Sequence, residues 1–260
     1  TVPVYLAEVS PAERRGSIVA VDQVMIVTGR HHTATHAYWH QLGLELPAIC
    51  CNGTYLYDFR HRRPLAGNPL TRQEAAELLA IFRKHPVHAM VYVADAMVCE
   101  KDSPHLDGLR RWSASLPETI RPRLEFVDSF ERLIEETETI WKFLAACEEI
   151  QALEAFESAV GAHSAFSCVR SASNRVDIAR GGNTKGQRLQ EYIAQLGILP
   201  EEVIAFGDQN NDKEMLELAG LGVAMGNSRE EIRDCADWVT GTNDSDGIAD
   251  VLHRFVLTAA

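Results

Sequence analysis

The stretch from Val203 to Leu216, Val-Ile-Ala-Phe-Gly-Asp-Gln-Asn-Asn-Asp-Lys-Glu-Met-Leu, constrains the fold of this chain more than any other. Its four leading apolar residues predict a short strand buried on both faces, as in a parallel sheet. We expect Gly207 to let the backbone turn sharply and so to place Asp208 at the carboxyl end of that strand. Open α/β sheets bind their ligands at this edge.

Two carboxylates and an amide gather after the strand. Asp212 follows Asp208 by four residues, at the start of an amphipathic helix, and Asn211 lies beside it. Hard cations such as Mg²⁺ take a few oxygen ligands and keep their other positions for water and phosphate. Asp212 alone would indicate only a helix cap. The whole Gly-Asp-x-x-Asn-Asp run predicts a magnesium site at Asp208 and Asp212.

Length, charge and cysteine usage narrow the class of protein. A chain of 260 residues can bury one large core or two modest ones, and we expect a core domain with one insertion. The net charge of −12, without a basic run, argues against nucleic-acid and membrane partners and favours small-molecule chemistry. Six cysteines without a C-x-x-C pair predict reduced thiols and a cytoplasmic location. No apolar run reaches the roughly 18 residues of a membrane span.

The first 28 residues are atypical of the rest. They predict a strand at 2–9, a helix that starts at the capping box of Ser10 and ends near Gln23, and a second strand at 24–27. The result is a minimal strand-helix-strand unit. Residues 1–29 also resemble the loop and helix start of sugar porters of the major facilitator superfamily, through Pro3-x-Tyr-Leu-x-Glu-x-x-Pro-x-x-x-Arg-Gly16. This resemblance implies a chimeric N-terminus.

The remaining pattern predicts an α/β core at 1–57 and 181–260 with an inserted α+β domain at 58–180. Gly53 and the pair Gly181-Gly182 are the expected hinges. Helices are predicted at 31–44, 72–84, 130–139, 185–196, 212–219, 229–236 and 248–256, and strands at 47–51, 55–57, 89–93, 140–144, 176–178, 203–206 and 223–225. Three histidines at 32, 36 and 40 share one helix face, a weak zinc pattern because no acid joins them.

Polar residues at strand ends and helix starts predict a pocket for phosphoryl transfer. The hydroxyl of Thr28 and the backbone amides of Gly29 and Arg30 would hold phosphate oxygens, and the ammonium of Lys185 would neutralise their charge. With Mg²⁺ on Asp208, this set can stabilise a transferring phosphoryl group. Each residue alone is ordinary, and it is their order along the chain that supports the prediction.

Five motifs resemble the haloacid dehalogenase superfamily, in its Cof-type phosphatase branch with a large cap domain. They are Val27-Thr-Gly-Arg30, Cys51-Asn-Gly-Thr54, Asn183-Thr-Lys-Gly186, Gly207-Asp-Gln-Asn-Asn-Asp212 and Gly222-Val-Ala-Met-Gly-Asn227. The resemblance covers residues 24–260. It implies a Rossmann-like core with a parallel sheet, a cap domain, and Mg²⁺-dependent hydrolysis of small phosphate monoesters such as pyridoxal phosphate or sugar phosphates.

The resemblance also implies a role for individual residues. Thr28 and Lys185 would bind the transferring phosphoryl group as catalytic residues, and Asp208 and Asp212 would form the metal site. The residues implied to face substrate are Gly29, Arg30, Asn52, Asp177, Arg180, Asn183 and Asn211.

The sequence departs from the family at the nucleophile. The resemblance implies two catalytic aspartates in an Asp-x-Asp-Gly-Thr run, and no such run is present. Asp22 is too close to Thr28, because a parallel crossover needs about a dozen residues. Glu8 is a weak candidate, since its longer side chain would misplace the attacking oxygen, and Ser10 would be a poor general acid. A catalytically inactive phosphate-binding module is therefore the alternative to an active phosphatase. A receiver-like signalling domain is disfavoured by the chain length.

Overall fold

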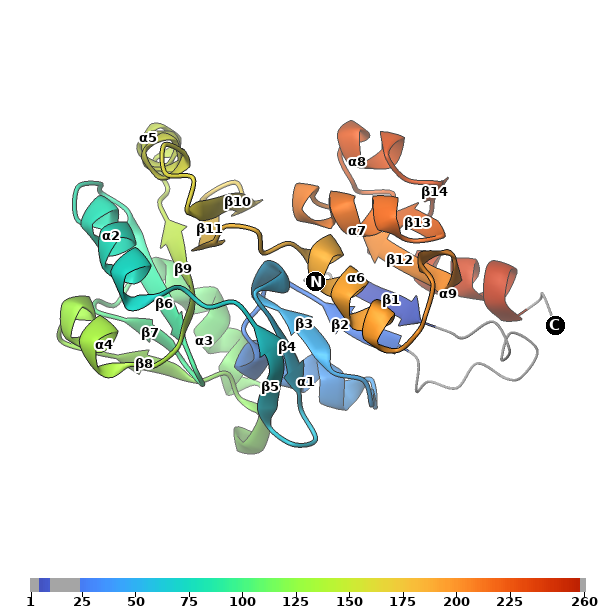
Figure 1. Ribbon diagram of the computed structural model, residues 1–260, viewed down its shortest axis with the longest axis horizontal. Coiled ribbons are helices and arrows are strands. Elements are labelled where there is room, and N and C mark those ends of the chain that lie inside the picture. Colours follow the sequence, from blue (N-terminus) through green and yellow to red (C-terminus); the bar gives the residue numbers. More distant parts are fainter. Residues whose placement is uncertain (1–4, 10–23, 258–260) are drawn as a thin grey trace. The chain divides into compact units, whose positions relative to one another are not determined.

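A computed structural model of the protein describes residues 5–9 and 24–257 (Figure 1). The chain divides into two compact units. The first contains Thr1–Thr28, Tyr38–Pro64 and Thr184–Ala260, and the second contains Gly29–Ala37 and Leu65–Asn183. Residues 29–37, which the sequence analysis assigned to the core domain, therefore group with the second unit.

The first unit is built on an eight-stranded sheet with the strand order β14-β13-β12-β1-β2-β3-β4-β5. Its strands are β1 (Tyr5–Val9), β2 (Val24–Val27), β3 (Ala48–Cys50), β4 (Tyr55–Asp58), β5 (Arg63–Gly67), β12 (Val203–Gly207), β13 (Leu221–Ala224) and β14 (Trp238–Val239). Strands β12, β13 and β14 pair in parallel, as do β2 and β3. The buried apolar run before Asp208 forms β12, as predicted.

The direction of β1 differs from the prediction. This strand pairs antiparallel with both β2 and β12. A strand-helix-strand crossover would have made β1 and β2 parallel, so that interpretation of the first segment is wrong. The helix predicted to start at Ser10 lies outside the described residues.

Helices pack on the sheet of the first unit. They are α6 (Lys185–Gln195), α7 (Lys213–Leu218), α8 (Glu230–Asp234) and α9 (Gly247–Leu252), which the π-helix η8 (His253–Leu257) follows directly. The unit also has three short 3₁₀ turns, η3 (Cys51–Gly53), η6 (Pro200–Glu202) and η7 (Asn210–Asp212). Helices α6 and α7 pack against each other, α6 also against β3, and α7 against β12 and β13. Helix α9 contributes Val251 to a cluster with Phe206 and Val223. Among the described residues, every helix is too short or too polar to span a bilayer.

The second unit has its own six-stranded sheet, in the order β10-β11-β9-β6-β7-β8. The strands are β6 (His88–Val93), β7 (Met97–Cys99), β8 (Leu124–Phe126), β9 (Ile140–Ala146), β10 (Phe166–Ala172) and β11 (Arg175–Arg180). The helices and turns are α2 (Arg72–Phe82), η4 (Pro104–Leu106), α3 (Asp107–Ala114), η5 (Glu118–Ile120), α4 (Phe130–Glu136) and α5 (Ile150–Gly161). Helix α1 (His32–Gln41) begins in this unit and ends in the first.

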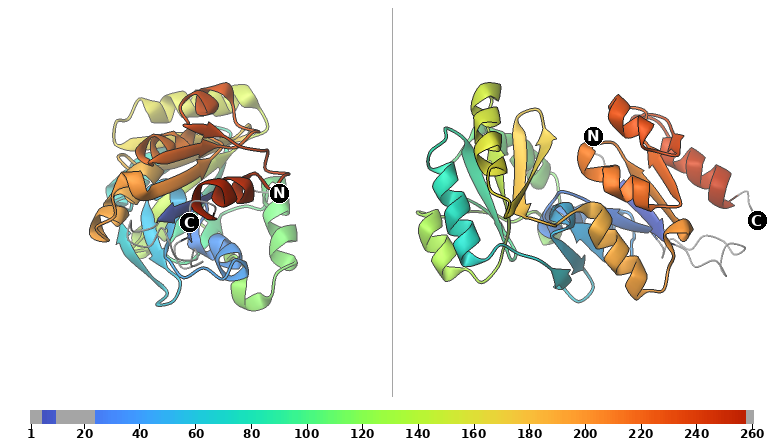
Figure 2. Two further views of the ribbon diagram at one scale, coloured as in Figure 1. Left: turned by 90° about the vertical axis from the view of Figure 1, so that its right-hand side faces the viewer. Right: turned by 45° about the horizontal axis from the view of Figure 1, so that its top comes forward.

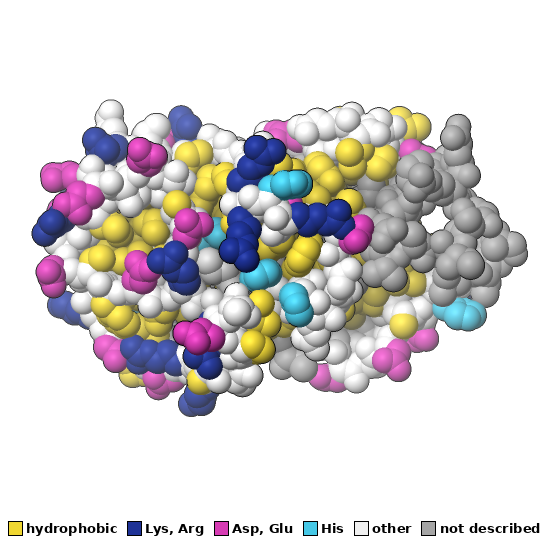
Figure 3. Space-filling view, turned by 90° about the horizontal axis from the view of Figure 1, so that it is seen from below, with side chains coloured by type: hydrophobic (Ala, Val, Ile, Leu, Met, Phe, Trp, Pro, Cys, Tyr) yellow, Lys and Arg dark blue, Asp and Glu magenta, His cyan; other side chains and the backbone are white. Residues whose placement is uncertain are grey.

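The core of the second unit lies between its sheet and helices α2, α4 and α5, which cover one face (Figure 2). Phe82 of α2, Phe130 of α4 and Phe156 of α5 are each at most 4% exposed there. On the face of this unit seen in Figure 3, basic and acidic side chains are interspersed.

Candidate active site

The register of β1 brings Thr28 and Asp208 to the same edge of the first-unit sheet. Glu8 pairs with Val24 on one side and with Ile204 on the other. Thr28 and Asp208 each lie four residues beyond those partners. Since neighbouring strands are about 4.8 Å apart, the two backbones are about 10 Å apart across β1. This is the edge at which the sequence predicted a ligand site.

Gly207 is required here by a close contact. A Cβ at this position would lie 2.4 Å from the Cβ of Asp212. The φ angle of Gly207 is not in the left-handed region. Glycine is therefore not needed for the sharp turn predicted from the sequence. It is needed because a side chain here would collide with the turn η7, which folds back onto β12.

The carboxylate of Asp212 is already occupied by protein donors. Its Oδ1 accepts a hydrogen bond from Lys185 Nζ at 2.6 Å, and its Oδ2 accepts from the backbone amides of Asp208 and Gln209, both at 3.0 Å. Asp212 is fully buried and Lys185 is 2% exposed. A buried ion pair with such complete hydrogen bonding fixes the lysine in place. This geometry favours Asp212 as the residue that orients Lys185, rather than as a direct metal ligand.

Asp208 has an unsatisfied oxygen. Among the described residues, its Oδ1 is one of two buried side-chain N or O atoms that lack a hydrogen-bond partner. Its Oδ2 accepts from Asn227 Nδ2 at 3.1 Å. Burial, and then the neighbouring Asp212, raise the pKa of Asp208 to about 6. A buried carboxylate oxygen without a donor costs free energy, and a bound cation would offset that cost.

Asn211 and Asn52 connect the metal side of the site to Thr28. Asn211 Nδ2 donates to Asn52 Oδ1 at 2.9 Å, and the backbone amide of Asn52 donates to the carbonyl of Thr28 at 3.0 Å. Asn211 belongs to the same turn as Asp212. Through the adjacent residues Asn211 and Asp212, two sets of hydrogen bonds therefore link Thr28 to Lys185 and Asp208.

Glu8 is not placed at this site. Its partners Val24 and Ile204 lie four residues before Thr28 and Asp208, a separation of about 13 Å along a strand. The register thus puts the Glu8 backbone toward the opposite end of the strands, so it gives no support to Glu8 as a nucleophile. The other candidates considered, Ser10 and Asp22, lie outside the described residues.

In the second unit, Gly29 and Asp177 share one buried lysine. Lys142 is 1% exposed, and its Nζ donates to Asp177 Oδ1 at 2.6 Å and to the carbonyl of Gly29 at 2.8 Å. The ammonium also lies 4.4 Å from the ring centre of Tyr92. Asp177 therefore neutralises a buried cation. Sequence reasoning missed Lys142, because its position in a largely apolar strand is ordinary for a lysine that reaches the surface.

Arg180 and Asn183 hold the chain where it leaves the second unit. Arg180 donates to Glu74 Oε1 at 3.1 Å and to Asn68 Oδ1 at 3.0 Å. Asn183 Nδ2 donates to the carbonyls of Asn68 and Arg180, both at 3.0 Å. Arg30, the remaining candidate in this unit, stacks its guanidinium over Trp112 at 5.4 Å. A role of these residues toward substrate stays a prediction.

The unpaired oxygen of Asp208 suits magnesium. In the described part of the chain, no three His, Cys, Asp or Glu side chains are grouped as a metal site. Mg²⁺ keeps several waters and binds through one or two carboxylates plus phosphate, which the free oxygen of Asp208 fits. His32, from the histidine row, is buried and lies 3.4 Å from Asp95.

The site residue that the sequence analysis missed in the first unit is Asn227. It ends the run Gly222-Val-Ala-Met-Gly-Asn227, which was noted only as a motif. Its side chain donates to Asp208 and accepts from the backbone amide of Asn243 at 2.9 Å. The residue thus orients the carboxylate that the sequence assigned to the metal.

Known proteins match this chain over most of its length. A family model described as haloacid dehalogenase-like hydrolase matches residues 22–252. Pyridoxal phosphate phosphatase YbhA of Escherichia coli is 39% identical over 90% of this chain and 86% of its own length. Phosphatase YwpJ of Bacillus subtilis is 30% identical over 90% and 88%.

A solved structure agrees with these relatives. A haloacid dehalogenase-like hydrolase from B. subtilis superposes with a TM-score of 0.78 at 28% identity, covering 89% of this chain and 87% of that one. The likeness of residues 1–29 to sugar porters gains no support from the comparisons.

Proposed function

The chain belongs to the haloacid dehalogenase-like hydrolase family, and on that premise we propose that it binds small phosphate monoesters together with Mg²⁺ and hydrolyses them. One observation supports this most directly: at one sheet edge, hydrogen bonds link Lys185 and the backbone of Thr28 to the segment that carries Asp208, whose Oδ1 is unpaired. Phosphoryl transfer depends on positioning and charge stabilisation by such groups.

Each residue of the set has a role in this proposal. The Lys185 ammonium and the Thr28 hydroxyl bind oxygens of the phosphoryl group, and Asn211 contacts the phosphate. Asp212 orients Lys185. Asp208 holds Mg²⁺ through its unpaired oxygen, and the ion supplies additional neutralisation of phosphate charge when it is bound.

The substrate we propose is a small phosphorylated metabolite of the class that includes pyridoxal phosphate and sugar phosphates. The name of the E. coli relative supports this class, and the net charge of −12 disfavours a nucleic acid. Gly29, Arg30, Asp177, Arg180 and Asn183 stay the proposed substrate-facing residues. We place the activity in the cytoplasm, because all six cysteines are free thiols.

A second candidate function is phosphate binding without turnover. It is favoured by the missing Asp-x-Asp-Gly-Thr run and by the register that separates Glu8 from the site. Covalent catalysis needs a carboxylate in line with the phosphorus atom. Neither the sequence nor the register of β1 identifies such a carboxylate.

Titration calorimetry with Mg²⁺, with and without inorganic phosphate, tests the proposal. We expect Asp208→Asn to weaken Mg²⁺ binding by at least about tenfold, since the unpaired anionic oxygen is lost. Lys185→Met should weaken phosphate binding, since the ammonium that would neutralise phosphate charge is lost. Asp250→Asn, at an exposed position on α9, is the matched control. Equal Mg²⁺ affinity in all four proteins would rule out the metal assignment.

A further inference from the structure

Three consecutive residues of the turn η3 have left-handed backbone angles. The φ angles are 51° at Cys51, 57° at Asn52 and 92° at Gly53. All three residues are buried. Only glycine adopts this region freely, asparagine tolerates it, and a cysteine there is strained. Such a backbone persists only where its surroundings hold it.

The turn is held by elements that carry the site. The amide of Asn52 donates to the carbonyl of Thr28, at the end of β2, and its Oδ1 accepts from Asn211 in η7. The carbonyl of Gly53 accepts from Arg188 Nε at 3.0 Å, in helix α6. These contacts reach the three segments that provide Thr28, Asn211 and Lys185.

Gly53 lies against the start of helix α6. A Cβ at Gly53 would be 2.0 Å from the carbonyl oxygen of Thr184, and 3.0 Å from the backbone nitrogen of Lys185. Thr184 caps this helix, since its side chain accepts from the amide of Gln187. Any side chain at position 53 must therefore displace the helix start that carries Lys185.

We infer that the left-handed turn Cys51–Gly53 positions the residues of the phosphate site. Asn52 fixes the side chain of Asn211 relative to Thr28, and Gly53 allows the helix start that carries Lys185 to pack against the turn. This rests on the proposed function for the identity of the ligand. It assigns Asn52 as a positioning residue that acts through Asn211, whereas the family resemblance implied direct contact with substrate. The strain of the turn is the cost of bringing three separate segments together.

A pair of glycine variants separates positioning from backbone strain. Gly43 also has a left-handed φ of 62°, but a Cβ there meets nothing within 4 Å. Gly53→Ala and Gly43→Ala both place alanine at a positive φ, 92° and 62°, and only Gly53→Ala also moves the start of α6. We expect Gly53→Ala to weaken phosphate binding by at least about tenfold, and Gly43→Ala to change it by less than about twofold. Equal effects of the two variants would overturn the inference.

Asn52→Gly removes the side chain and keeps a residue that adopts this φ angle freely, so we expect this variant to fold. It therefore tests the inference even if Gly53→Ala proves unstable. In the protein without ligand, we expect faster hydrogen exchange at the amides of Asp208, Gln209 and Asp212, because η7 loses the contact of Asn211. A residue that only touched the ligand would leave this exchange unchanged, and that result would also overturn the inference.

A double-mutant cycle completes the test. If Asn52 acts through Asn211, then Asn52→Gly combined with Asn211→Ala should bind phosphate no more weakly than Asn211→Ala alone. Additive losses would mean that Asn52 binds the ligand itself. If the unmodified chain binds no phosphate, the proposed function fails, and the exchange rates of the ligand-free variants decide the inference by themselves.

Discussion

At the scale of single residues, the unusual group is Asp208. Its carboxyl is buried beside a second carboxylate, and its Oδ1 lacks a donor. The sequence predicted that this residue ends a strand and lies near Asp212. It could not predict that Lys185 and two backbone amides would donate hydrogen bonds to the carboxylate of Asp212, because those contacts depend on where α6 packs. The division of roles between the two aspartates is therefore a tertiary feature.

The raised pKa of Asp208 makes stability depend on pH. The carboxyl loses its proton near pH 3.8 in the unfolded chain and near 6 in the folded one. Between these values the folded state binds more protons, so the free energy of unfolding falls as pH rises through this window. The fall is at most about 3 kcal/mol, at about 1.4 kcal/mol per pKa unit.

Asp208→Asn removes this titration. Without Mg²⁺, we expect the variant to be more stable than the original chain at about pH 7.5, and of similar stability near pH 4. Urea unfolding at a series of pH values measures the difference, and Asp250→Asn serves as the exposed control. A difference between Asp208→Asn and the original chain that does not change with pH would show that the carboxyl is not perturbed by burial.

At the scale of elements, some helices and strands were predicted from their patterns and others were missed. The predicted helix 72–84 is α2 (Arg72–Phe82), and the predicted strand 203–206 is β12. Helix α5, which buries Leu153, Phe156 and Val160, and the buried strand β7 were not predicted. Strands β5 and β10 were not predicted either. Strand β5 is at the sheet edge, contains Pro64 and is mostly exposed, and β10 is only partly buried. Neither has an apolar pattern to detect, because edge strands bury little surface.

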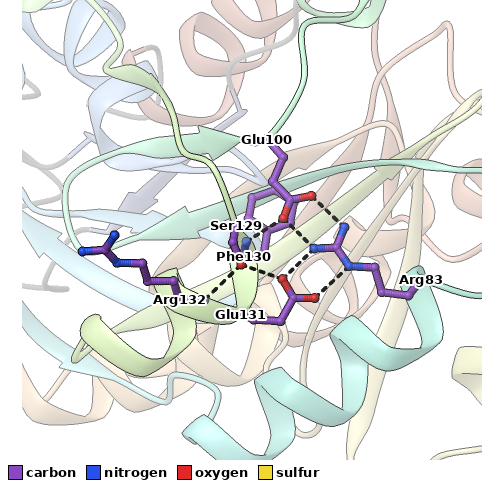
Figure 4. Close-up of polar contacts among 6 residues, drawn as sticks. All are labelled: Arg83, Glu100, Ser129, Phe130, Glu131 and Arg132. Carbon is purple, nitrogen blue, oxygen red and sulfur yellow. Dashed lines mark hydrogen bonds and ion pairs between the residues drawn. The ribbon is translucent and has the colours of Figure 1, made fainter.

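An arginine network ties together elements of the second unit (Figure 4). Arg83 follows α2, and it donates to Glu100 Oε2 at 2.6 Å and to both carboxylate oxygens of Glu131, at 3.0 and 2.9 Å. Glu100 also accepts from the amide of Phe130, at the start of α4. The hydrogen bonds from Arg83 hold the pKa of Glu131 at about 2. Only a planar guanidinium can pair with both carboxylates in this way.

Arg83→Lys is therefore expected to lower the free energy of unfolding by about 1 kcal/mol, since Arg83 is partly exposed and the pairs are screened. The comparison variant is Arg132→Lys, in a single exposed pair with Glu136, for which about 0.3 kcal/mol is expected. Urea unfolding gives both values. If the two variants lose the same stability, the network adds nothing beyond an ordinary surface ion pair.

At the scale of the whole molecule, the direction of β1 separates the two candidate functions. β1 lies between β2 and β12, the strands that lead to Thr28 and Asp208. A parallel strand in this place would end midway between them, about 5 Å from each neighbour. The antiparallel β1 instead brings Tyr5 to that edge, opposite Val27. The family model matches from residue 22 onward, so the part that departs from the family is also the part that would supply a nucleophile.

Under the second candidate function, the chain binds phosphate esters and turns them over slowly or not at all. Replacing residues 1–23 by a strand ending in Asp-x-Asp-Gly-Thr, followed by a crossover of at least about a dozen residues, should restore a parallel strand and raise the rate by several orders of magnitude. The same replacement with Ala-x-Ala-Gly-Thr is the control, because it restores the strand without its carboxylates. All three proteins are assayed on pyridoxal phosphate and small sugar phosphates with saturating Mg²⁺. A kcat of about 1 to 10³ s⁻¹ in the original chain, abolished by Glu8→Gln, would show that Glu8 is the nucleophile and that the antiparallel register does not describe the active protein.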